Sequence, residues 1–223
     1  MIAAVTWMPA VVEVLKQTFG PRLLFVGLQG SYRRGEATET SDIDLCVILD
    51  RLEPADFPRL RAVLDALPEG EKAAGFVCGA PELAAWPAFE LFAFVKDMDA
   101  WYGELAPLLP PITKADINLG VRTAVAALYH EAAQLLLAAD ALDAEAAAKA
   151  VHSLRKSFLR ALQGVLYLRT GEFPRDRAEA LRRAQEGEGD MLRTDGEGLP
   201  LKGMAAACLV WSGASLAELA GEA

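Results

Sequence analysis

Residues 28–50, LQGSYRRGEATETSDIDLCVILD, bring a Gly-Ser pair, two arginines and two alternate aspartates into one short span between apolar runs. Gly30 and Ser31 end an apolar run, and such a turn offers backbone N–H groups and a hydroxyl to a phosphate. Glycine lets the backbone approach a ligand without a Cβ in the way. Ten residues separate Ser31 from Asp42, and Asp44 follows at the alternate position. Alternate residues of a strand share a face, so the two carboxylates would project together.

The paired aspartates predict a cation, because two adjacent carboxylates repel each other unless something positive lies between them. Mg²⁺ meets this need, since it takes carboxylate oxygens and keeps sites for water and phosphate. A phosphate-binding turn beside a metal site indicates phosphoryl or nucleotidyl transfer, because catalysis of these reactions depends on positioning and charge neutralisation. Arg34 and Ser41 are further candidates for contact with the nucleotide, although Arg34 could equally solvate the turn.

The alternative for this stretch is an ordinary strand–turn–strand with its acids at a solvent edge. Asp42 and Asp44 interrupt an apolar run where a buried strand would carry Val or Ile, and this favours the functional interpretation.

The elements that must position these residues alternate between strand and helix in the first half. Short apolar or aromatic runs predict strands at 22–29, 42–50, 73–79 and 88–97. Helical spacing predicts helices at 9–19, 54–67 and 81–86. The pattern favours an α+β fold, in which a mixed sheet with flanking helices forms a catalytic domain over residues 1–110.

The second half is rich in Ala and Leu and has few strand signals. It predicts helices at 113–139, 143–171, 175–184 and 201–220, with a Gly-rich acidic loop at 186–198. The prolines in LLPPIT (108–113) mark the boundary, and residues 111–223 would form an all-α bundle that covers the nucleotide and substrate.

Residues 28–49 resemble the signature of the nucleotidyltransferase superfamily related to DNA polymerase β, in its branch of minimal and aminoglycoside nucleotidyltransferases. The signature is a hydrophobic residue, Gly, Gly or Ser, a spacer, and Asp-hydrophobic-Asp/Glu-hydrophobic. It is met by Gly30, Ser31 and DIDL (42–45), while Gln29 departs from it at the first position. The RRGEAT stretch also resembles the Ala-Arg-Gly-Glu-Ala segment of the family.

The resemblance implies a third acid on a strand beside that of the aspartates. Glu90, in the predicted strand 88–97, is the matching residue, and Asp97 and Asp99 are its rivals. Glu90 would be the general base that deprotonates the acceptor hydroxyl. ATP or another nucleoside triphosphate would be the co-substrate, and two Mg²⁺ ions would be held by Asp42, Asp44 and Glu90.

The helical half resembles aminoglycoside adenylyltransferases at GVLYLRTGEFPRDRAEAL (164–181). There a basic residue after Thr-Gly-Glu meets the nucleotide phosphates, a place that Arg175 or Arg177 would hold. Separately, Lys149, His152, Lys156 and Arg160 share one face of the predicted helix 143–171. That face is either solvated or, with Lys156 as a phosphate contact, a source of the cations that the first half lacks.

Composition and charge narrow the class of protein. Hydrophobic residues make up 53% of the 223, which predicts a folded globular protein. Residues 1–112 carry 9 Lys and Arg against 16 Asp and Glu, so a nucleic-acid partner is disfavoured. The N-terminus is unlike a signal peptide, and no uninterrupted apolar run is long enough to span a bilayer. We therefore expect a cytoplasmic protein without membrane partners. Cys46, Cys78 and Cys208 look like buried apolar residues.

These observations predict a Mg²⁺-dependent nucleotidyltransferase that moves a nucleoside monophosphate, AMP from ATP, to a hydroxyl of a small-molecule acceptor such as an aminoglycoside-like antibiotic. Two other functions stay open. One is a protein adenylyltransferase of the minimal-nucleotidyltransferase toxin–antitoxin type, and the other is a non-catalytic nucleotide-binding module.

Overall fold

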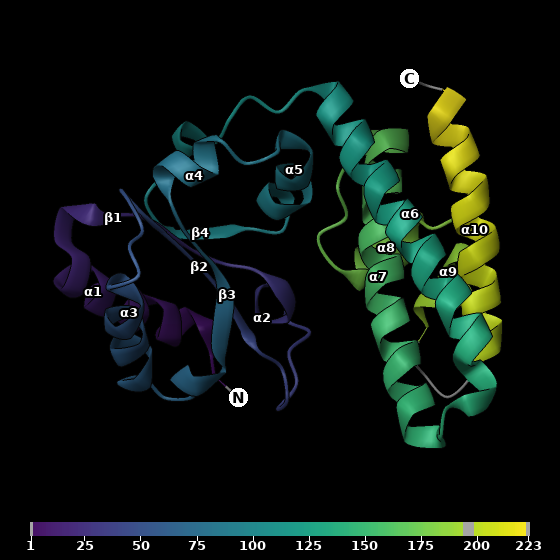
Figure 1. Ribbon diagram of the computed structural model, residues 1–223, viewed down its shortest axis with the longest axis horizontal. Helices are drawn as coiled ribbons and strands as arrows, with labels where there is room; N and C mark the ends of the chain where they lie inside the picture. The colour runs from purple at the N-terminus through teal and green to yellow at the C-terminus, as the bar shows by residue number, and fades with distance from the viewer. Residues whose placement is uncertain (1, 194–198, 222–223) are drawn as a thin grey trace. The chain divides into compact units, whose positions relative to one another are not determined.

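The computed structural model describes residues 2–193 and 199–221. The chain divides into two compact units, Met1–Pro111 and Ile112–Ala223, a boundary one residue beyond the predicted one. The first unit holds the sheet and the second is helical (Figure 1).

The first unit is built on a mixed four-stranded sheet in the order β3-β2-β1-β4. Its strands are β1 (Leu23–Leu28), β2 (Ile43–Leu49), β3 (Ala73–Gly79) and β4 (Asp99–Tyr102). β1 is antiparallel to both β2 and β4, and β2 is parallel to β3. The apolar runs predicted at 22–29, 42–50 and 73–79 are thus confirmed as strands, and the mixed sheet is confirmed.

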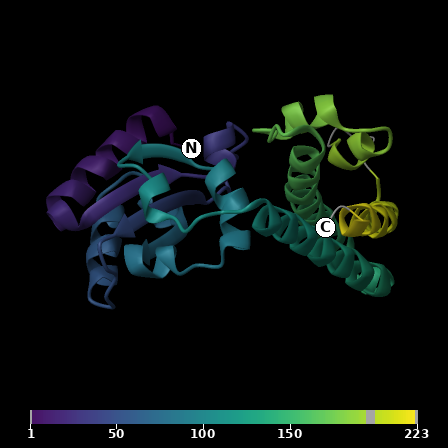
Figure 2. The same ribbon diagram turned by 90° about the horizontal axis from the view of Figure 1, so that it is seen from above.

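Helices cover the sheet because their apolar faces need burial. The longest is α1 (Ala4–Phe19), which packs along β1 and β4 (Figure 2). It forms the core with α3 (Asp56–Asp65), burying Met8, Leu15 and Leu60 against strand residues. The shorter helices of this unit are α2 (Gly30–Arg34), α4 (Ala80–Ala84) and α5 (Ala88–Lys96), with 3₁₀ turns at Gly20–Arg22, Gly70–Lys72 and Ala106–Leu108.

The strand predicted at 88–97 is wrong, because these residues form helix α5. The aromatic content suggested a strand, but Ala88, Leu91, Phe92 and Val95 recur at helical spacing, and Leu91 and Phe92 are buried. Pro87 stands at the N-cap position of α5, where no intrahelical hydrogen bond needs the N–H that proline lacks. The fourth strand, β4, follows α5 instead and joins the free edge of β1.

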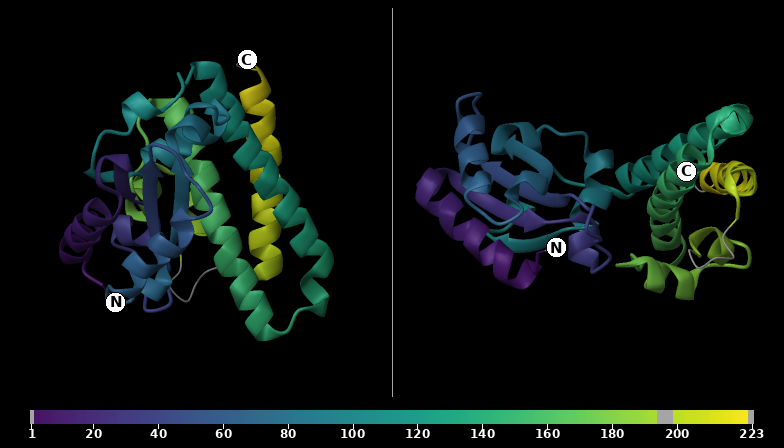
Figure 3. Two further views of the ribbon diagram at one scale, coloured as in Figure 1. Left: turned by 60° about the vertical axis from the view of Figure 1, so that its left-hand side comes forward. Right: turned by 90° about the horizontal axis from the view of Figure 1, so that it is seen from below.

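The second unit is a bundle of helices, as predicted. Its long helices α6 (Lys114–Ala138), α7 (Ala144–Thr170) and α10 (Leu201–Gly221) run alongside one another (Figure 3). The predicted caps are confirmed. Thr113 and Asp116 form a capping box at α6, Asp143 accepts from the Ala146 N–H at α7, and Gly171 ends α7 in the left-handed region.

Two shorter helices complete this unit, α8 (Arg177–Arg183) and α9 (Glu188–Leu192). The prediction of a loop over residues 186–198 is wrong for residues 188–192, which form α9. Residues 194–198 lie outside the described residues. The buried side chains of Met191 and Leu192 pack this short helix onto the bundle, which is why it forms despite its glycines.

Among the described residues, α10 is long and apolar enough, by length and composition, to cross a membrane. Its mean hydropathy is 1.3. A core helix of a soluble protein passes the same test, and α10 packs against α6 and α7.

Candidate active site

The turn after β1 consists of Gln29 and the first residues of α2, Gly30 and Ser31. Its backbone lies against the carboxylate of Asp44. Gly30 has φ +70°, and a Cβ built on it would lie 1.8 Å from Asp44 Oδ2. The N–H of Gln29 donates to the main-chain oxygen of Asp44 at 2.9 Å. Glycine suits this position, because a Cβ would force the Asp44 carboxylate to move and would stand in a backbone conformation that other residues rarely adopt.

The two aspartates stand where β2 begins. Ile43 and Leu45 are buried in the core that α1 covers, so Asp44 between them points to the other face of the sheet. Asp44 is half-buried, while Asp42 precedes the strand and is exposed. The predicted alternation of core residues and carboxylates is therefore present at Asp44.

The segment before Asp42 is held by a small turn. Ser41 Oγ accepts from the Thr38 N–H at 2.9 Å and shares a 3.1 Å hydrogen bond with Thr38 Oγ1. Lys72 Nζ donates to the Glu39 carbonyl at 2.9 Å. Ser41, predicted to bind the nucleotide, thus has a role in the turn that places Asp42.

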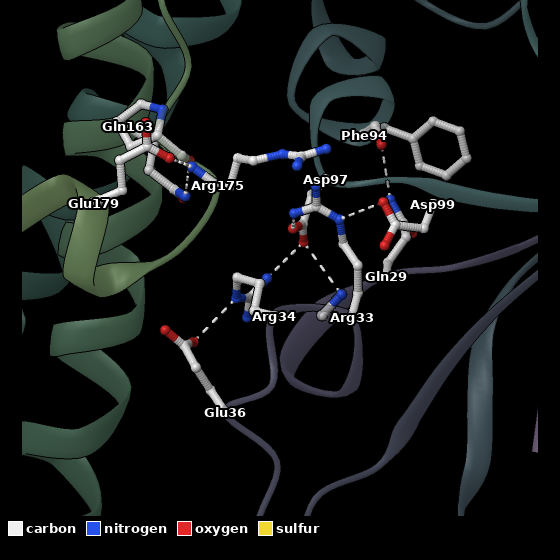
Figure 4. Close-up of polar contacts among 12 residues, drawn as sticks. Gln29, Arg33, Arg34, Glu36, Phe94, Asp97, Asp99, Gln163, Arg175 and Glu179 are labelled. Carbon is white, nitrogen blue, oxygen red and sulfur yellow. Dashed lines mark hydrogen bonds and ion pairs between the residues drawn. The ribbon is translucent and has the colours of Figure 1, made fainter. Parts of the chain in front are cut away.

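Asp97 ties the end of α5 to the turn after β1 (Figure 4). Its Oδ2 accepts from the Gly30 N–H at 3.2 Å and from Arg34 Nη1 at 2.6 Å, while its Oδ1 accepts from Arg33 Nη1 at 3.0 Å. Arg33 also reaches Asp99 Oδ1 through Nε at 3.2 Å. In the sequence, Asp97 and Asp99 stand out only as rivals of Glu90, and no signal there points to Arg33.

The guanidinium of Arg34 forms ion pairs with two carboxylates. Besides Asp97 it donates to Glu36 Oε2 at 3.1 Å. Partial burial acts to lower the pKa of Arg34, but the charges and hydrogen bonds of Asp97 and Glu36 outweigh it, and the pKa is raised. Its predicted contact with phosphate stays a prediction, and that contact would have to compete with these two carboxylates.

Glu90 lies on helix α5 and not on a strand beside β2. It is exposed, and its Oε2 accepts from Trp86 Nε1 at 2.8 Å. The strand parallel to β2 is β3, AAGFVCG, which holds no acid. The structure therefore removes the strand placement on which the third-acid prediction rested, because residues 88–96 pack their apolar side chains in helical register. The catalytic role of Glu90 stays a prediction.

No group of three or more His, Cys, Asp or Glu side chains within residues 2–193 and 199–221 could hold a metal ion. The cysteines do not change this, since all three are buried and free. Burial, with a contribution from Glu82, raises the pKa of Cys78 to about 11, which keeps its thiol protonated.

The second unit carries a row of cations on α7. Lys149, His152, Lys156 and Arg160 are all exposed, and Leu154 and Phe158 of the opposite face are buried, as the spacing predicted. Partial burial and then the charges of Lys156, Arg177 and Arg155 lower the pKa of His152. The imidazole is therefore neutral near pH 7, and the positive charge of this face comes from lysine and arginine.

Arg175 lies on the segment that joins α7 to α8. Its N–H donates to Glu179 Oε2 at 2.8 Å, and the neighbouring Pro174 carbonyl accepts from the buried Gln163 amide at 2.8 Å (Figure 4). These bonds hold the backbone while the Arg175 residue stays exposed. Arg175 is thus placed at the surface of the helical unit.

Comparison with known proteins gives a match to a family model over part of the chain. Residues 8–78, from α1 to β3, match the family model described as nucleotidyltransferase domain. Comparison with curated proteins gives no match.

One solved structure is similar over nearly the whole chain. It is the crystal structure of spectinomycin adenyltransferase AAD(9) from Enterococcus faecialis with ATP and spectinomycin. The likeness covers 96% of this chain and 99% of that chain, with a TM-score of 0.56 and 14% sequence identity. At this identity the likeness concerns the fold, a mixed sheet with flanking helices followed by a helical region.

Proposed function

We infer that this chain, whose residues 8–78 match the nucleotidyltransferase domain model, is an enzyme that transfers AMP from ATP to a hydroxyl of a small-molecule acceptor. The observation that carries the proposal is the contact of Gly30 with Asp44. Backbone and carboxylate meet so closely that a Cβ would fall 1.8 Å from Asp44 Oδ2, and a triphosphate bound at the turn would lie beside the carboxylate.

The residues present fit Mg²⁺. Asp42 and Asp44 offer two carboxylates, and Mg²⁺ is commonly bound by one or two carboxylates with water and substrate phosphates as the other ligands. A preformed group of three protein ligands is not needed. When bound, Mg²⁺ would supply neutralisation of the charge on the triphosphate. Two ions, with Glu90 as a further ligand, remain part of the proposal.

The chain's own residues would then divide the remaining work. The Gly30 and Ser31 turn would hold the β- and γ-phosphates, and Ser41 would keep Asp42 in place. Glu90 would take the proton from the acceptor hydroxyl. Asp97 is a weaker candidate for that step, because three donors already engage its oxygens.

The acceptor is proposed to be a cationic, hydroxyl-bearing small molecule of the aminoglycoside-like class. Two observations support this. The unit that carries the aspartates is acidic, with 16 Asp and Glu against 9 Lys and Arg in residues 1–112, and charge complementarity favours a cation. The solved structure of similar fold contains ATP and spectinomycin. We propose a cytoplasmic location, in line with the three free, buried cysteines.

The test is incubation with each labelled nucleoside triphosphate and Mg²⁺, with a panel of aminoglycoside-like and protein acceptors, read by mass spectrometry. We expect a small molecule to gain the mass of one AMP. Asp44→Asn should lower the rate at least a hundredfold, on the order of the loss of one charge-stabilising group, and Asp65→Asn, an exposed control paired with Arg61 on α3, should not.

Two outcomes would replace the proposal with an alternative. Label found on a protein would favour a protein adenylyltransferase. Nucleotide binding without transfer to any acceptor would favour a non-catalytic nucleotide-binding module.

A further inference from the structure

The segment that leads from α5 into β4 holds the phosphate-binding turn at several points. Asp97 accepts hydrogen bonds from the Gly30 N–H, Arg33 and Arg34. One turn earlier, the Phe94 carbonyl accepts from the Gln29 side-chain amide at 2.9 Å. Donors from 29–34 thus meet acceptors from 94–99, a separation of more than 60 residues along the chain.

The guanidinium of Arg33 is shielded from solvent, whereas its carboxylate partners are partly exposed, with Asp99 at 49%. The Arg33 side chain is 4% exposed and that of Asp97 is 26% exposed. A buried guanidinium needs its carboxylate partners, because loss of one leaves an uncompensated charge in a region of low dielectric. Arg33 is paired with both Asp97 and Asp99, so the arginine fixes the direction from which the Asp97 carboxylate approaches the turn.

Gly30 is therefore held from two sides. Asp97 accepts its N–H at 3.2 Å, and Asp44 bounds it on the Cα side, where no Cβ would fit. The preceding Gln29 N–H is tied to the Asp44 carbonyl at 2.9 Å. A shift of Gly30 toward Asp44 would displace the Asp44 carboxylate, and a shift away from Asp44 is opposed by the hydrogen bonds of Gly30 and Gln29.

We propose that Asp97 is a positioning residue of the nucleotidyl-transfer site, which sets the place of the Gly30 and Ser31 turn relative to Asp44. The inference rests on the proposed function. Asp97 acts through the turn, because its carboxylate already accepts from the Gly30 N–H and pairs with two guanidinium groups (Figure 4). Binding of the triphosphate depends on the turn, so Asp97 should govern affinity for the nucleotide.

Asp97→Asn tests this with little change in side-chain volume. The amide cannot neutralise two guanidinium groups, and the Gly30 N–H loses its charged acceptor. We expect KM for ATP to rise about tenfold or more, the scale of a hydrogen bond to a charged group, with a smaller change in kcat. With the backbone amides labelled with ¹⁵N, the Gly30 N–H signal should move and exchange faster with solvent.

The matched control is Asp56→Asn. Asp56 is 2% exposed and pairs with Arg22 at 2.8 Å, a comparable ion pair. Arg22 precedes β1 whereas Gly30 follows it, so this pair lies at the other end of the strand. We expect the control to lower the melting temperature and to leave both KM for ATP and the Gly30 signal unchanged. A purely structural role of Asp97 would give the same pattern as the control and would overturn the inference.

A second variant covers a failure of Asp97→Asn to fold. Asp97→Glu keeps the charge and displaces the carboxylate by one methylene, so we expect a folded enzyme with a smaller rise in KM. An unchanged KM in the folded variants, or tighter ATP binding, would overturn the inference. If the wild type transfers no nucleotide, the proposed function fails and this inference fails with it. If the wild type and both variants transfer nucleotide with the same KM, only this inference fails.

Discussion

Gly30 shows how a single residue can decide whether two functional groups meet. Its φ of +70° and the 1.8 Å approach of a built Cβ to Asp44 Oδ2 are separate constraints. Gly35, at the end of α2, has nearly the same φ of +71°, but nothing lies within 4 Å of its Cβ. Comparing substitutions at Gly30 and Gly35 therefore separates the effect of backbone strain, which both would have, from the effect of contact with Asp44, which only Gly30 has.

We predict that Gly30→Ala lowers the transfer rate about a hundredfold, because a displacement on the order of 1 Å at a reacting centre has that effect. Gly35→Ala pays the same strain of about 1–2 kcal/mol in the left-handed region and should keep most of the activity. Rates of AMP transfer and melting temperatures of the two variants are compared. Equal loss of activity in both would mean that the contact with Asp44 is unimportant.

At the scale of elements, short helices form where long ones hold them. Helix α9 depends on Glu188, which is 4% exposed. Its Oε1 accepts from Arg169 Nη1 of α7 at 3.0 Å and from Trp211 Nε1 of α10 at 2.8 Å, and its Oε2 accepts from the Gln185 N–H at 2.8 Å. One carboxylate thus joins α9 to two helices of the bundle.

We predict that Glu188→Ala destabilises the helical unit by about 2 kcal/mol, since Trp211 loses its acceptor and Arg169 keeps only its more exposed partner Glu218. Urea unfolding followed by circular dichroism gives the free energy of unfolding. Glu145→Ala is the control, because Glu145 pairs with Lys149 at a position where both side chains are at least 75% exposed, and such pairs contribute about 0–1 kcal/mol. Similar losses in the two variants would contradict the role of Glu188.

At the scale of the whole molecule, charge is divided unevenly between the two units. Residues 1–112 have a net charge of −7 and residues 113–223 a net charge of −2, so cations for a triphosphate are scarce in the unit with the aspartates. The exposed row on α7 could supply them, a hypothesis that the exposure of Lys156 permits.

We predict that Lys156→Ala weakens ATP binding about tenfold, the scale of one charge-assisted hydrogen bond. Lys149→Ala is the control on the same face, since Lys149 Nζ is already paired with Glu145 Oε1 at 2.7 Å. Affinity is measured by titration calorimetry with Mg²⁺ present. Unchanged affinity in Lys156→Ala would remove the α7 face from the nucleotide site and leave it as a solvated surface.

The features that could be predicted from the sequence are those that depend on neighbouring residues of the chain. The Gly30 turn, the strand that carries Asp44, and the caps Thr113, Asp143 and Gly171 follow from residue type and from a periodicity of two or 3.6 residues. Such signals act within a few residues, so they can be recognised without knowing the partner segment.

Contacts between elements that are distant in the chain could not be predicted and became known from the three-dimensional structure. The stretch at 88–96 is a helix because its apolar side chains pack in helical register, which its aromatic content did not reveal. Arg33, Arg34 and Gly30 converge on Asp97 across more than 60 residues. A carboxylate in sequence gives no sign of which distant donors will neutralise it. That depends on strand order, since β4 pairs with β1 and thereby brings residues 97 and 99 beside the turn.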